Sequence, residues 1–182
     1  MESPENNNDR VFDEIGTEIR VYNAGLIILW PFLTRFFERL SLVKNGEFVN
    51  DESENRAVYL LQYLAYDRID FPEYELALNK LFVGLPLENH LYPIAELKED
   101  EKDLCLSLLN GVIANWDKVK NSSTEAIQGT FLQRDGILTI KKDSIALVIE
   151  KKGVDVLLNS LSWNISIIKL PWMKKPMHVE WV

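Results

Sequence analysis

The side chains best suited to chemistry are few in this sequence and stand far apart. The chain of 182 residues has 2 histidines, His90 and His178, and 1 cysteine, Cys105. No two of these stand at a spacing that zinc sites use, and Cys105 lies among leucines, where we expect it to be buried and far from either histidine. We therefore expect no catalytic residue and no metal ligand. Cys105 is interpreted as a small buried hydrophobe, and both histidines as surface or packing residues.

Glycines and carboxylates also fail to form a reactive site. The 8 glycines are scattered and form neither a phosphate-binding loop nor a dinucleotide fingerprint, so we expect no cofactor. Glu73, Glu75 and the acidic run at residues 99–103 stand at expected helix starts, where the helix dipole favours negative charge. These positions explain the carboxylates without acid-base catalysis, and we expect the protein not to be an enzyme.

Large aromatic residues are concentrated near the end of the chain. Trp163, Trp172 and Trp181 lie close together in the sequence, and Met173 follows the second of them. Tryptophan and methionine supply large apolar contacts and are enriched at the centres of protein interfaces. Together with Trp30, these residues are the candidate contacts to another protein. The alternative is that they close a small sheet onto the helices, and the sequence leaves both interpretations open.

Composition and charge narrow the class of protein. The chain is 47% hydrophobic and 26% charged, which is typical of folded globular domains. Its formal net charge of −8 repels phosphate backbones and anionic headgroups, so we expect neither nucleic-acid binding nor attachment to membrane surfaces. A basic surface on a protein partner would complement this charge, although the charge also serves solubility.

No segment predicts export or insertion into a membrane. The longest apolar stretch, residues 24–33, contains Pro31 and is much shorter than the roughly 20 residues of a spanning helix. The start of the sequence lacks the basic residues and apolar stretch of a secretory signal. We therefore expect a cytoplasmic protein.

Apolar residues at helical spacings predict helices through the first two thirds of the chain. The expected helices cover residues 30–41, 51–67, 71–84, 99–119 and 124–133. After Gly136 the period changes, and residues 137–141 and 145–150 predict a hairpin because they are rich in β-branched side chains. A short helix near residues 154–161 and strands near 163–168 and 177–181 complete the prediction.

The expected fold class is α+β, with an N-terminal bundle of about five helices followed by a small antiparallel sheet with one short helix. Residues 1–20 are predicted to be a disordered or weakly ordered lead, since residues 1–10 are polar and have little to bury. Residues 21–182 are predicted to form a single domain, with a helical part at 21–134 and a β-rich part at 135–182. The length suits one hydrophobic core.

Two long segments resemble those of a known family. Residues 23–33 read NAGLIILWPFL and residues 36–40 read FFERL, and residues 166–173 near the C-terminus read SIIKLPWM. Residues 57–64 and 74–81 match the same pattern between them. The chain therefore resembles the tape measure proteins of bacterial contractile injection systems, chiefly their conserved C-terminal portion.

This resemblance implies a component of a phage-tail-like particle, in which a sheath contracts around an inner tube. The implied partners are other particle proteins, namely tube, spike, baseplate or cap components, and the protein is expected in the cytoplasm or in the assembled particle. Family members are typically longer than this chain. A compact domain of this size has a radius of gyration of about 16 Å, so it cannot measure a long tube by being stretched along it.

The predicted function is therefore that of a structural or assembly component. We expect it to dock onto neighbours or to initiate tube assembly rather than to act as a stretched ruler. The alternative is a small adaptor or chaperone that holds a particle component or a cargo protein before loading. The oligomeric state is left open by the sequence.

Overall fold

The structure is a computed structural model, and it describes residues 16–182. Its strands are β1 (Thr17–Val21), β2 (Val43–Lys44), β3 (Glu47–Phe48), β4 (Gly136–Ile140), β5 (Ile145–Ile149), β6 (Ile167–Ile168) and β7 (Met177–Trp181). Its α-helices are α2 (Trp30–Arg39), α3 (Asp51–Tyr66), α4 (Ala77–Phe82), α5 (Glu99–Ala114) and α6 (Thr124–Ile127). Shorter helical segments are η1 (Ala24–Leu29), η2 (Glu73–Glu75), η3 (Asp117–Val119), η4 (Gln128–Leu132) and η5 (Gly153–Ser160).

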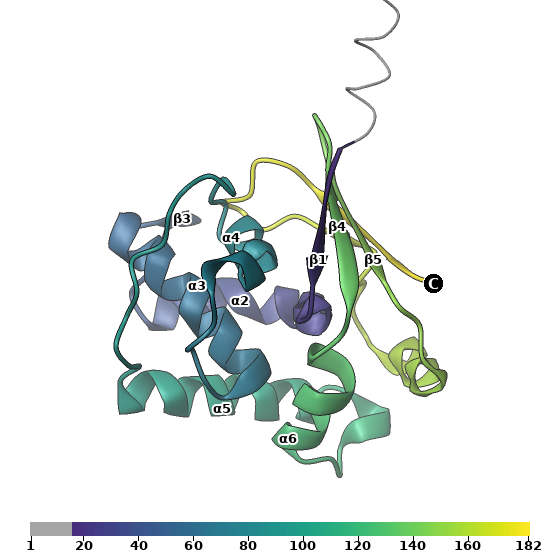
Figure 1. The fold of residues 1–182 in the computed structure, drawn as a ribbon. Coiled ribbons are helices and arrows are strands. Elements are labelled where there is room, and N and C mark those ends of the chain that lie inside the picture. Colours follow the sequence, from purple (N-terminus) through teal and green to yellow (C-terminus); the bar gives the residue numbers. More distant parts are fainter. Residues whose placement is uncertain (1–15) are drawn as a thin grey trace, which may run out of the picture.

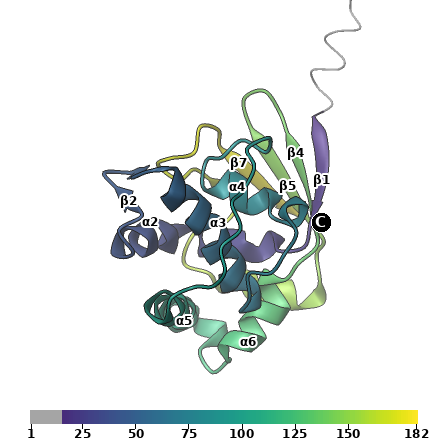
Figure 2. The same ribbon diagram turned by 60° about the vertical axis from the view of Figure 1, so that its left-hand side comes forward.

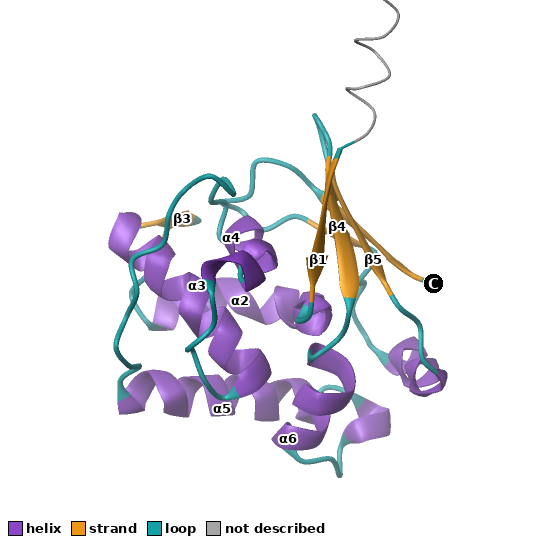
Figure 3. Ribbon diagram, viewed as in Figure 1, coloured by secondary structure: helices purple, strands orange, loops and turns teal. Residues whose placement is uncertain are grey.

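A five-stranded sheet and a group of helices form two layers (Figures 1 and 3). The strand order is β1-β4-β5-β7-β6, and the separate pair β2-β3 forms a small ribbon. Figure 2 shows α3 and α4 in front of the sheet, with β1 at its edge. The helices therefore cover one face of the sheet.

The predicted arrangement, a helical bundle followed by an antiparallel sheet, is wrong although the fold is α+β. The first described element is a strand, because β1 pairs antiparallel with β4 and Thr17 lies opposite Ile140. The sheet is mixed, since β5 and β7 run parallel. A strand with only five residues and no turn partner nearby gives a weak local signal, and the pairing of β1 depends on a segment more than 110 residues later.

The predicted lead of residues 1–20 falls largely outside the described residues. Within the described part, Thr17–Val21 is strand β1 rather than irregular chain. The predicted boundary inside the domain, between residues 134 and 135, comes just before β4. Strand β1 shows that the sheet draws on both ends of the described chain.

The individual helices follow the apolar periodicity closely. Helix α3 begins after Asn50, its N-cap, whose side chain accepts a hydrogen bond from the Ser53 N–H. It ends at Asp67, which adopts a left-handed conformation with φ of 57°. The expected helix at residues 99–119 is divided into α5 and the short η3.

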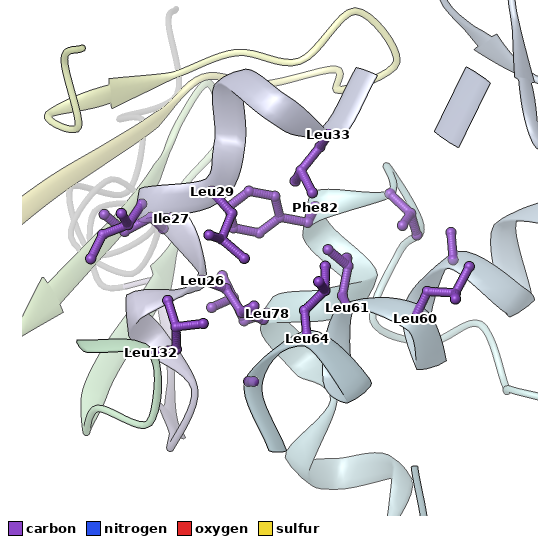
Figure 4. Packing of buried hydrophobic residues seen from close by; sticks show 14 of the residues in the cluster. Leu26, Ile27, Leu29, Leu33, Leu60, Leu61, Leu64, Leu78, Phe82 and Leu132 are labelled. Atoms are coloured by element: carbon purple, nitrogen blue, oxygen red, sulfur yellow. The ribbon is translucent and has the colours of Figure 1, made fainter. Parts of the chain in front are cut away.

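The hydrophobic core lies between the sheet and the helices, and η1 runs through its centre. Every residue of η1 is buried, and Ile27, Ile28 and Leu29 are fully inaccessible to solvent. Figure 4 shows Leu26 and Leu29 packing toward Leu78 and Phe82, which α4 supplies. The longest apolar stretch of the sequence therefore supplies the central element of a globular core.

Candidate protein interface

Two of the candidate contact residues join the helical layer to the segment before β6. Trp30 is partly buried, and its Nε1–H donates to the Asn164 carbonyl at 2.7 Å. Trp163 is also partly buried, and its Nε1–H donates to the Ile28 carbonyl at 2.9 Å. The ring of Trp163 meets Phe32 edge-on, with 5.2 Å between ring centroids. The two hydrogen bonds run in opposite directions between residues 28–30 and residues 163–164, and together they connect η1 and α2 to the segment before β6.

Trp172 and Met173 join the end of the chain to the other side of the helical layer. The Trp172 Nε1–H donates to the Phe82 carbonyl at 2.7 Å, at the end of α4. Its ring lies edge-on to Phe37 and Phe48, with centroid separations of 5.8 and 5.0 Å. Met173 is 3% exposed and belongs to the hydrophobic core. This site is an aromatic cluster that holds α2, β3 and α4 together.

Trp181 ends β7 and is partly buried. The guanidinium carbon of Arg134 lies 5.1 Å from the centroid of its ring, a cation-π arrangement. Among the described residues its buried Nε1 has no hydrogen-bond partner. All the candidate tryptophans therefore make extensive contacts inside the chain, and their role in binding another protein stays a prediction.

The family-like segment at residues 23–33 has a buried polar cluster at its start. The Asn23 side-chain amide donates to Gln62 Oε1 at 2.9 Å and to Asn79 Oδ1 at 2.6 Å. The Asn79 amide donates in turn to the Val58 carbonyl at 3.0 Å. All three side chains are almost fully buried. Because buried amides are costly when left unpaired, this cluster fixes η1 relative to α3 and α4.

Gly25 explains why this segment tolerates no side chain at its third position. A Cβ atom built there would lie 1.6 Å from the Phe131 carbonyl oxygen and 2.7 Å from the Leu132 Cα. The backbones of η1 and η4 thus touch directly. The signature residues at 23–33 are explained by packing, without any catalytic or ligand-binding role.

Buried ion pairs are the main charged groups inside the fold. The Arg134 guanidinium donates to both Asp155 oxygens at 2.7 Å, and both side chains are at most 1% exposed. Burial by itself raises the pKa of Asp155, but hydrogen bonds from Arg134 and the Lys152 N–H outweigh it and hold the pKa below its ordinary value. The same balance, with Arg56 and the Lys98 N–H as donors, lowers the pKa of Glu101. In both pairs the carboxylate is bound by an arginine and by a backbone N–H, so these charged groups stabilise the fold.

The cysteine and the two histidines lie apart from one another in the fold. Cys105 is 1% exposed, and burial raises the pKa of its thiol, so a nucleophilic thiolate is strongly disfavoured. His90 is almost fully exposed in a loop, and His178 lies on the outer side of β7. In residues 16–182 no group of three or more histidine, cysteine or acidic side chains is arranged to hold a metal ion.

An apolar groove lies at one end of the sheet. It has a volume of about 670 Å³ and extends from Leu81 and Leu85 in and after α4 to Ile140 and Ile145 at the β4-β5 turn. Lys174 and Lys175 stand at its margin. Most of the side chains that line the groove are apolar, so its shape favours apolar contact over chemistry.

The face of the sheet away from the helices is a second candidate surface, and the interface residues predicted from the sequence do not include it. We call it the open sheet face, and define it by the residues whose side chains point outward from the strands: Glu18, Arg20, Ile137, Thr139, Ala146, Val148, Ile167, His178 and Glu180. Ile137 is 45% and Ile167 54% exposed, while the inward residues of the same strands are mostly buried. The alternation within residues 137–141 and 145–150 could have revealed this face, had each residue been assigned to a side.

The comparison with family models gives the decisive result. The model described as contractile injection system tape measure protein matches residues 1–181. The chain belongs to this family. No curated protein and no solved structure matches the chain significantly.

Membership of the contractile injection system tape measure family places the chain among structural components of such systems, a role that is not enzymatic. The family also implies contact with other components of the particle. Within residues 16–182, no helix has both the length and the apolar character required to cross a membrane. The resemblance read from the sequence motifs is thus confirmed over essentially the whole chain.

Proposed function

We propose that this protein docks onto neighbouring components of the particle, or initiates assembly of its tube, rather than acting as a stretched ruler. The family match over residues 1–181 carries the particle context. The packing of residues 16–182 into two layers supports the docking role, because helices, strands and core contacts would all have to separate before the chain could extend.

In this proposal, those of the five predicted contact residues that reach the surface bind the neighbouring component. Trp30, Trp163, Trp172 and Trp181 are partly exposed, and each could present one ring edge to a neighbour while its other atoms hold the fold. Met173 is 3% exposed, so it offers almost no surface to a neighbour. Such rigid, half-buried aromatic residues lose little conformational entropy on binding.

Deleting the gene and imaging the particles by electron microscopy tests the proposal. We expect few or incomplete particles, because docking or initiation would be lost. Normal particles of unchanged length and number would contradict it. Capture of the protein from cells that lack assembled particles distinguishes the adaptor or chaperone alternative, since a chaperone would retain its partner there and be missing from finished particles.

A further inference from the structure

The open sheet face has an ordered pattern of charge and apolar side chains. Strand register places Arg20, Ile137, Val148 and Glu180 in one row across β1, β4, β5 and β7. The neighbouring row is Glu18, Thr139, Ala146 and His178 in the same strand order, and it continues to Ile167 on β6. Both rows are charged on β1 and apolar or weakly polar on β4 and β5. The two rows carry opposite charges on β1.

Helices α3 and α4 lie on the opposite side of the sheet from this face (Figure 2). The connection from β5 to β7 runs on the helical side instead, where Trp116 donates to the Leu157 carbonyl of η5 at 3.0 Å. Ile137, at the middle of the first row, remains 45% exposed. A sheet face with apolar residues at its centre is the type of surface that another sheet can cover.

We propose that the open sheet face binds the same face of a second copy of this chain. The two-fold axis lies in the interface, between the two rows and perpendicular to the strands. Such an axis places each row opposite the other row of the second copy, which is the self-complementarity that a two-fold interface requires. The charge pattern of the face is the observation that selects this occupant.

The side chains that face each other across this axis have complementary charge or polarity on β1 and on β7. Glu18 faces Arg20 of the second copy, and His178 faces Glu180 of the second copy, each pair occurring twice. In the centre, Ile137 faces Thr139 and Val148 faces Ala146 of the second copy. Apolar contact therefore occupies β4 and β5, and polar pairs lie on either side of it, on β1 and on β7.

The ends of the strands distinguish this axis from the other possible one. Asp135 and Glu150 lie at one end of the face, where they line the same shallow hollow as Arg20 and Ile137. Lys141 follows β4 at the opposite end and is exposed. The proposed axis brings Lys141 toward Asp135 of the second copy. An axis parallel to the strands would instead place Asp135 opposite Glu150, two like charges.

The size of the face predicts a weak and reversible dimer. Four strands spaced by about 4.8 Å, each with 5 residues, give a patch roughly 20 Å on each side. Such a patch buries less surface than the roughly 800 Å² per partner of a standard stable interface. We expect dissociation in the range of about 1–100 μM, with salt weakening the marginal ion pairs.

Sedimentation velocity of the purified chain over a range of concentrations tests the dimer without reference to the particle. The Ile137→Glu variant should stay monomeric at concentrations where the wild-type chain dimerises, because it buries a carboxylate in the centre. Leu106→Glu is the matched control, since Leu106 is 50% exposed on α5, away from the face. Its dimerisation should be unchanged. A wild-type chain that is monomeric up to several hundred micromolar overturns the proposal, as does an Ile137→Glu variant that dimerises normally.

A charge exchange then tests the axis. Arg20→Glu should weaken the dimer at least tenfold, because it places two carboxylates opposite each other twice. Adding Glu18→Arg should restore most of the affinity, although the double variant still lacks the 3.3 Å contact of Arg20 with Asp135. Restoration by Glu180→Arg and not by Glu18→Arg would overturn the proposed axis. Thermal unfolding of each variant confirms that the fold is kept.

Discussion

At the scale of single residues, packing explains the family-like motif at residues 23–33. Gly25 lets η1 touch the backbone of η4, and Asn23 completes a buried cluster with Gln62 and Asn79. Arg134 and Asp155 form an ion pair that is almost free of solvent contact. Each of these residues is sensitive to substitution because its surroundings are dense and its polar partners are fixed.

Gly25→Ala should destabilise the protein strongly. The added Cβ would overlap the Phe131 carbonyl oxygen, and a backbone atom cannot move aside as a flexible side chain can. We expect a loss of about 3 kcal/mol or more in the free energy of unfolding, measured by urea denaturation. Gly111→Ala is the control, since nothing lies within 4 Å of its added Cβ on α5. That change should stabilise slightly, by roughly 0.5–1 kcal/mol. Equal effects at both positions would contradict the close contact.

Asp155→Asn should destabilise the protein in a manner that depends on pH. The folded pKa of Asp155 is lowered, so its contribution is complete above the unfolded pKa of about 3.9 and is lost as pH falls through the folded pKa. At pH 7 the variant leaves Arg134 buried without its counter-charge, and we expect a loss of about 3–5 kcal/mol.

Urea denaturation at several pH values measures this difference. The gap between wild type and Asp155→Asn should narrow as pH falls below about 4. Asp143→Asn, at an exposed position in the β4-β5 turn, should cost less than about 0.5 kcal/mol at every pH. A gap of constant size from pH 7 to pH 3 would show that the charge of Asp155 does not stabilise the fold.

At the scale of elements, the C-terminal signature acts as a clasp, by which we mean residues 170–173 packed on α2, β3 and α4. Leu170 and Met173 are buried, and Trp172 bonds to the end of α4. The segment contains little regular structure of its own. Its order therefore depends on the aromatic cluster beneath it.

Trp172→Ala should cost about 3–5 kcal/mol, because it removes a large ring from contact with Phe37 and Phe48. Trp172→Phe should cost less, since it keeps an aromatic ring and loses the hydrogen bond to the Phe82 carbonyl, worth roughly 1 kcal/mol. Hydrogen exchange should show faster exchange at the end of α4 and in residues 170–177 for the alanine variant. Unchanged exchange in both places would contradict the clasp.

At the scale of the whole molecule, the two-layer fold determines whether the chain could set tube length by being stretched along the tube. Sheet and helices share one continuous core, in which η1 is fully buried. A folded body of this kind contributes a fixed dimension to an assembly. Its effect on tube length should therefore be independent of the number of residues in its surface loops.

Inserting about 20 glycine and serine residues into the β4-β5 turn at residues 142–144 tests this independence. We expect tubes of unchanged length, measured by electron microscopy of purified particles. A ruler that is extended as a helix would lengthen the tube by about 30 Å for such an insertion. Lengthening of that size would contradict the docking proposal, and circular dichroism of the variant checks that it folds.

The sequence by itself determined the local elements and the family. Helical spacing located α2, α3 and α5, the change of period after Gly136 located β4 and β5, and two long motifs indicated the family that the model match confirmed. These features depend on neighbours close along the chain, which is why periodicity reveals them.

Only the tertiary structure decided how the elements combine. In the fold β1 pairs with β4, and β7 runs parallel to β5. The indole N–H groups of Trp30 and Trp172 donate hydrogen bonds to backbone carbonyls of the same chain. The tertiary structure also left Ile137 exposed on an open sheet face. Pairing between distant strands and the side that a ring faces depend on contacts across more than a hundred residues, and no local pattern encodes them.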